Sequence, residues 1–231
     1  MLIKYMKITK IGLIFGGVAL MSLTAGATIY NTGYSVSVNG SGQLVDNLWT
    51  VTALANTNGI SLPAPPYSAF VLPSPTITWP WDTSQAPAGA NTGNTQWDSN
   101  QQPAFGGSDT AGMITTYTLN FTAPVGAYSL YFEDDNYVQM YLGAVSPANL
   151  FYSELPAHNG TDFLGWQNTT VNVTTAGANQ LNILVYNYPY PTGNYTGLRV
   201  NFATTTVPEP STMALMAGGV ALLFGAIKRR K

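Results

Sequence analysis

Apolar and polar side chains alternate in the second half of the chain. Between Thr116 and Thr122, the apolar residues Tyr117, Leu119 and Phe121 take every second position, and threonine and asparagine take the others. A period of two residues is typical of a β-strand that buries one of its faces. This segment therefore predicts a half-buried strand.

Five further segments have the same alternation, with turn-forming residues between them and no helical period of useful length. They cover residues 128–132, 138–142, 171–173, 181–185 and 198–202. Six short strands joined by turns predict an all-β fold, as an antiparallel β-sandwich or jelly roll.

The rest of the chain between its two apolar ends predicts no second domain. Residues 34–38 alternate and residues 48–54 predict a strand, whereas residues 63–107 are rich in Pro, Gly, Asn, Ser and Gln. The apolar residues of 63–107 are too sparse for a separate core. We expect one β-sandwich domain over residues 28–207, with long loops at 63–107.

Charge and cysteine content exclude several classes of protein. Residues 28–207 contain nine acidic residues and one basic residue, Arg199, which gives a net charge of −8. A surface with that charge repels phosphate backbones, so no nucleic-acid partner is expected. The chain has no cysteine, which excludes disulfides and thiol chemistry. Few charges with many polar and aromatic residues favour an exported β protein.

The N-terminus has the three parts of a secretory signal peptide. Lys4, Lys7 and Lys10 precede a mainly apolar run of 13 residues, after which Ala25 and Ala27 supply small side chains at positions −3 and −1. We expect residues 1–27 to be a helical signal peptide that the translocon accepts and signal peptidase removes after Ala27. The alternative is a retained anchor, for which the run is short.

The C-terminus predicts a membrane anchor that follows an extended segment. Pro208, Glu209 and Pro210 precede 17 uncharged residues at 211–227, the lower limit for a transmembrane helix, and the cations at 228–231 follow. Terminal cations stay on the cytoplasmic side, which places residues 28–207 outside. The two prolines prevent helix formation just outside the membrane.

These three C-terminal parts, in this order, resemble the PEP-CTERM sorting signal of Gram-negative bacteria. The resemblance covers residues 207–231. It implies an inner-membrane-anchored precursor that an exosortase processes at or near Pro208-Glu209-Pro210. The protein would then reach the cell envelope, the outer surface or the extracellular matrix. The alternative is an ordinary tail anchor with a proline-rich stalk.

A second resemblance covers roughly residues 97–202. Trp97 is followed by Tyr117-Thr118-Leu119-Asn120-Phe121, then Asp135 to Gly143, Asn179 to Val185, and Thr196 to Phe202. This order is similar to the galactose-binding-like ectodomains that are common among PEP-CTERM proteins. It departs from their pattern at Gly143 and in the tyrosine-rich insertion 186–195. The resemblance implies the fold but no particular ligand.

The residues that commonly carry catalysis are few. His158 is the single histidine and lies in a turn-like stretch, and no nucleophile elbow or phosphate-binding loop is present. We therefore expect no enzyme and no catalytic residues. A secreted carbohydrate-active enzyme that uses an Asp/Glu pair is the alternative, because two carboxylates suffice for a glycosidase.

Glu133, Asp134 and Asp135 form the densest group of charges. Carboxylate oxygens suit Ca²⁺, so a structural calcium ion is one hypothesis, although no firm metal site or cofactor is expected. The simpler interpretation is a solvated hairpin turn. A third is that Asp135 turns inward to pair with Arg199.

Aromatic residues gather in two loop segments. They are Trp79, Trp81, Tyr188, Tyr190 and Tyr195, with asparagines beside the tyrosines. Aromatic rings stack on sugars and amides bond to hydroxyl groups, so these residues are candidate glycan contacts. Alternatively they pack the loops onto the sandwich. We expect an exported, non-catalytic envelope, matrix or biofilm protein that binds or organises exopolysaccharide.

Overall fold

Eleven strands and no α-helix make up the part of the chain that the computed structural model describes, namely residues 29–57, 62–72, 96–100, 112–154, 165–187 and 196–203. One short 3₁₀ turn, Pro147–Asn149, is also present. In chain order the strands are β1 (Val36–Val38), β2 (Leu44–Ala55), β3 (Tyr67–Leu72), β4 (Trp97–Ser99), β5 (Ile114–Ala123), β6 (Gly126–Asp135), β7 (Tyr137–Leu142), β8 (Leu150–Ser153), β9 (Gln167–Val173), β10 (Gly177–Tyr186) and β11 (Gly197–Phe202).

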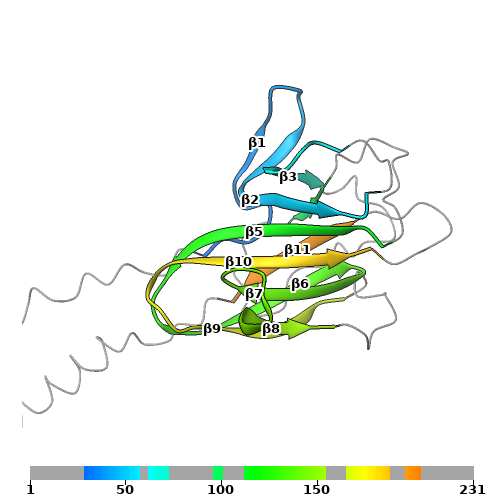
Figure 1. Cartoon of the computed structure of the whole chain (residues 1–231). Helices are drawn as coiled ribbons and strands as arrows, with labels where there is room; N and C mark the ends of the chain where they lie inside the picture. Colours follow the sequence, from blue (N-terminus) through cyan, green and yellow to red (C-terminus); the bar gives the residue numbers. More distant parts are fainter. Residues whose placement is uncertain are drawn as a thin grey trace, which may run out of the picture. The chain divides into compact units, whose positions relative to one another are not determined.

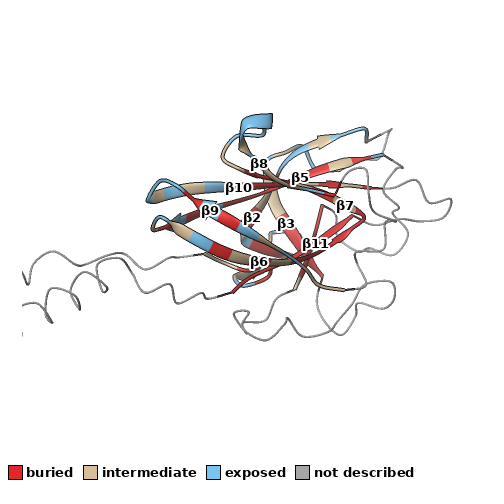
Figure 2. Cartoon of the chain, turned by 90° about the horizontal axis from the view of Figure 1, so that it is seen from below, coloured by how far each residue is buried: buried red, intermediate tan, exposed pale blue. Residues whose placement is uncertain are grey.

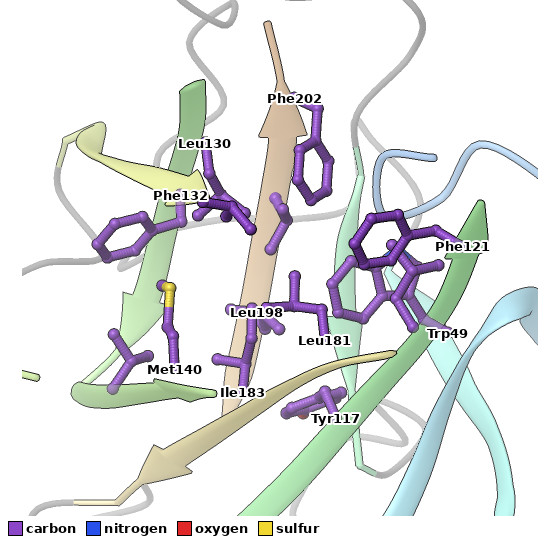
Figure 3. Packing of buried hydrophobic residues seen from close by; sticks show 14 of the residues in the cluster. Trp49, Tyr117, Phe121, Leu130, Phe132, Met140, Leu181, Ile183, Leu198 and Phe202 are labelled. Atoms are coloured by element: carbon purple, nitrogen blue, oxygen red, sulfur yellow. The ribbon is translucent and has the colours of Figure 1, made fainter. Parts of the chain in front are cut away.

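The strands form one antiparallel sheet in the order β8-β7-β10-β5-β2-β3-β4-β11-β6-β9, and β1 adds to β2 (Figure 1). The sheet folds back on itself, so that apolar side chains of β5 and β10 meet those of β6 and β11 (Figure 3). The rings of Phe121 and Phe202 lie 6.4 Å apart, and those of Phe132 and Tyr152 lie 5.1 Å apart. The fold is thus all-β and sandwich-like, as expected.

The alternation of the second half predicts the inner face correctly. Tyr117 and Leu119 are buried on β5 and lie opposite Ile183 and Leu181 of β10. Figure 2 shows buried residues along β6, β7 and β11 and exposed ones near the ends of β9 and β10. The six strands expected from the pattern are β5, β6, β7, β9, β10 and β11.

The long loop region expected at 63–107 contains two strands, so that expectation is corrected. β3 and β4 lie in the middle of the strand order, between β2 and β11. Four consecutive residues of β3, Ala69 to Leu72, are buried, which gives no alternation for a pattern to detect. β4 has three residues, of which Asp98 and Ser99 are polar, and it exists because its neighbours pair with it.

Residues 27–205 cluster as one compact unit, which contains all of the described residues. The signal peptide expected at 1–27, with Ala25 and Ala27, and the segment 208–231, with the transmembrane helix expected at 211–227, lie outside the described residues. Among the described residues, no helix is long and apolar enough to cross a membrane.

Candidate functional site

The candidate glycan contacts named from the sequence are not among the described residues. This applies to Trp79, Trp81, Tyr188, Tyr190 and Tyr195, and also to His158 and the sorting residues Pro208, Glu209 and Pro210. A glycan-binding role for the five aromatic residues stays a prediction.

The acidic residues of the described chain lie inside the domain. Each of the six is at most 2% exposed: Asp46, Asp98, Glu133, Asp134, Asp135 and Glu154. The strongly acidic surface expected from composition is therefore wrong for this part of the molecule. A buried charge is costly unless it is paired or neutralised, so each carboxyl needs a partner or a proton.

Arg199 forms an ion pair with Glu133. Its Nη1 lies 3.0 Å from Glu133 Oε2, and its guanidinium lies 4.6 Å from the centre of the Trp166 ring. The sequence suggested Asp135 as the partner of Arg199. Glu133 is the directly opposite residue in the β6–β11 register, whereas Asp135 lies opposite Gly197.

The solvated hairpin turn proposed for Glu133, Asp134 and Asp135 is also corrected. These residues end β6, where they pair with β11, and all three are buried. Within the described ranges, no group of three or more His, Cys, Asp or Glu side chains is arranged to hold a metal ion. The calcium hypothesis stays a prediction.

Asp46 and Asp98 form a buried pair of carboxyl groups. Asp46 Oδ2 accepts the Gly33 N–H at 2.6 Å, and Oδ1 accepts the N–H groups of Leu48 and Trp49 at 2.8 and 3.2 Å. Burial raises the pKa of Asp98 well above its usual value, and the neighbouring Asp46 raises it further. Burial also raises the pKa of Asp46, against the effect of its N–H bonds. The geometry fits a charged Asp46 and a protonated Asp98 that donates to it.

An open, uncharged groove lies where β5 and β10 pair. Its volume is about 610 Å³, within the range of known ligand sites. The register sets Asn120 opposite Gln180 and Phe121 opposite Asn179. The described residues that line the groove are Tyr30, Asn120, Phe121, Thr122, Ala178, Asn179 and Gln180. They supply amides, hydroxyl groups and aromatic rings, and none of them is an acidic or basic residue.

Tyr30 brings an aromatic ring to the groove from the segment before β1. Its carbonyl accepts a hydrogen bond from the indole N–H of Trp49 at 3.3 Å, which ties the segment to the core. The ring centre of Tyr30 lies 5.3 Å from that of Tyr34, which is 54% exposed. A pair of partly accessible rings therefore lies beside the amides.

Sequence reasoning missed this groove. It placed Asn120 on the polar face of β5 but gave no reason to join it to Gln180 or Tyr30. The available signal was the amide pair Asn179-Gln180 at the start of the segment 181–185. That signal becomes specific only once the β5–β10 register is known.

The structure thus describes an all-β domain with an uncharged groove on its surface. Sequence similarity adds information on where the protein is sent after synthesis. Residues 206–231 match the PEP-CTERM protein-sorting motif. This motif indicates an exported, exosortase-targeted protein whose precursor is membrane-anchored in a Gram-negative bacterium.

No curated protein matches the chain. Among solved structures, a β-glucosidase from Kluyveromyces marxianus in complex with glucose matches 45% of this chain and 13% of its own, with 11% identity and a TM-score of 0.30. A likeness of that size carries no argument about fold or function. The resemblance to galactose-binding-like domains is not confirmed by it.

Proposed function

We propose that the domain is a non-catalytic component of the cell envelope or extracellular matrix that binds exopolysaccharide through the groove at β5 and β10. The observation that carries the proposal is the lining of that groove. Amide and hydroxyl groups bond to sugar hydroxyls, and the ring of Tyr30, beside which the Tyr34 ring lies, offers flat apolar area for a sugar face.

The position of the carboxyl groups supports a binding role over a glycosidase. A glycosidase needs two carboxyl groups that flank the scissile bond within reach of substrate. The coupled carboxyls of Asp46 and Asp98 are fully buried, and the described lining of the groove contains no acidic residue.

Removal of two of the three groove amides tests this proposal. We expect the double variant Asn120→Ala/Gln180→Ala to bind the cell's own purified exopolysaccharide about thirtyfold more weakly, because each lost hydrogen bond contributes about 1 kcal/mol. The measurement is a pull-down titration of the full chain.

A matched control comes from β9, at the other end of the strand order. Asn168 and Asn172 are exposed there, and the double variant Asn168→Ala/Asn172→Ala should bind like the wild type. Equal binding by wild type and the groove variant, with unchanged melting temperature, would exclude the groove as the site.

The sorting signal predicts a defined processed product. Mass spectrometry of the exported protein should show an N-terminus at Thr28 and loss of the apolar tail 211–227. Alanine in place of Pro208, Glu209 and Pro210 should leave the tail attached and the protein in the membrane. Thr204→Ala/Thr205→Ala, just before the matched residues, is the control. Intact Lys231 in wild-type material outside the cell would contradict processing.

A further inference from the structure

The C-terminal end of the domain lies beside the groove. Phe202 is the last residue of β11, and the N–H of Ala203, which follows it, donates to the carbonyl of Ser129 at 3.0 Å. The ring centre of Phe202 lies 6.4 Å from that of Phe121, which lines the groove (Figure 3). The groove is therefore next to the point at which the chain leaves the described domain toward the sorting motif.

The N-terminal end of the domain is held at the same place. The N–H of Phe202 donates to Asn31 Oδ1 at 2.9 Å. Tyr30, which lines the groove, directly precedes Asn31. The described domain thus begins and ends beside the groove. The two segments that the sequence predicts to enter the membrane, 1–27 and 211–227, are therefore both connected to this end of the domain.

The tether between the domain and the expected membrane segment is short. Residues 204–210 separate Ala203 from Ser211, the first residue of that segment. In any conformation, the chain from Ala203 to Ser211 spans at most about 28 Å. The lipid headgroup layer takes about 5–7 Å of that length. A compact domain of about 180 residues is about 40 Å across. Because the tether is shorter than the domain, the end at Ala203 cannot reach the side that faces away from the membrane.

We propose that the membrane anchor of the precursor keeps the groove from the polymer, and that removal of the anchor by the exosortase makes the groove accessible. This inference rests on the proposed glycan-binding function. A polysaccharide that occupies the groove continues beyond it at both ends. The tether leaves only about 20 Å between this end of the domain and the headgroups. An oligosaccharide of a few sugars fits there, whereas a long polymer has most of its arrangements excluded. Sorting then precedes polymer binding.

The anchored and the processed forms are compared on the cell's own purified exopolysaccharide. The full chain with alanine at residues 208–210, expected to keep its anchor, is placed in phosphatidylcholine nanodiscs. The processed wild type is purified from outside the cell. We expect the anchored form to bind immobilised polymer about tenfold more weakly, as exclusion of nine in ten arrangements would give. Short fragments of the same polymer should bind both forms equally. The hindrance comes from the bilayer, so the same variant outside a membrane should bind polymer like the processed protein.

A longer tether tests whether distance from the membrane is the cause. A flexible insert of about forty Gly and Ser residues between Thr205 and Thr206 makes the extended tether several times longer than the domain. In the nanodisc, this anchored variant should bind the polymer like the processed protein. The same insert between Gly40 and Ser41, in the exposed turn between β1 and β2 (Figure 1), is the control. It should leave polymer binding weak.

The outcomes separate this inference from the proposed function. Equal polymer binding by the anchored and the processed forms would overturn the inference and leave glycan binding in place. Weak polymer binding by the long-tether variant, with an unchanged melting temperature, would also overturn it. Failure of the processed protein to bind either the polymer or its short fragments would remove the proposed function and this inference together.

Discussion

Replacement of Arg199 by methionine is expected to lower the free energy of unfolding by about 3–5 kcal/mol. Arg199 pairs with Glu133 at 3.0 Å, and the Glu133 side chain is fully buried. Without the guanidinium, Glu133 loses the cation that faces its buried carboxylate, and it must keep its charge inside the domain without that cation or take up a proton. The loss of contact with the Trp166 ring adds to the cost. Urea unfolding followed by tryptophan fluorescence gives the measurement.

The control for this prediction removes both charges. Arg199→Met/Glu133→Leu should recover most of the lost stability, because a buried ion pair replaced by apolar residues of similar volume is often close to neutral. If the single variant loses less than about 1 kcal/mol, the pair does not hold this part of the sheet together.

A second large effect is expected from pH. The pKa of Asp98 is raised well above its ordinary value of 3.8, first by burial and then by Asp46, whose own pKa is also raised. Above pH 3.8 the folded state therefore holds a proton that the unfolded chain releases. The stability due to Asp98 is fully present below that pH and is lost as the pH rises toward the raised pKa. For one proton the slope is about 1.4 kcal/mol per pH unit.

The domain should therefore melt at a higher temperature at pH 4.5 than at pH 8, as circular dichroism would show. Asp98→Asn imitates the protonated carboxyl and keeps a donor toward Asp46. This variant should match the wild type in acid, exceed it at pH 8 and have a flatter profile. A wild-type profile that rises from pH 4.5 to pH 8 would mean that Asp98 is charged in the folded state.

Local pattern predicted the strands in which apolar and polar residues alternate, including β11, whose six residues are all buried, and it failed for β3 and β4, which have no such alternation. Tyr117 and Leu119 alternate with threonine, so β5 is visible in the sequence. β3 has a continuous buried run and β4 has polar residues at two of its three positions, so neither has a period that marks a strand. β4 depends in addition on a partner far away in the chain, because it pairs with β11.

The groove was hidden for a related reason. Tyr30, Asn120 and Gln180 are separated by about 60 residues or more in sequence, and pairing of β5 with β10 brings the last two together. The orientation of the Gln180 amide depends in addition on Asn182, whose Nδ2 donates both to the Gly143 carbonyl and to Gln180 Oε1. No spacing rule contains such information.

Because its charged side chains are buried, the described part of this domain should respond little to the salt concentration of its surroundings. All seven charged side chains of the described residues, six carboxyls and Arg199, lie inside. Dissolved ions screen charges that face water, and this part of the surface offers them nothing to screen. Contacts made by this surface should keep the same strength in dilute fresh water and in brine. An anionic polymer would neither repel the described surface nor attract it across a distance.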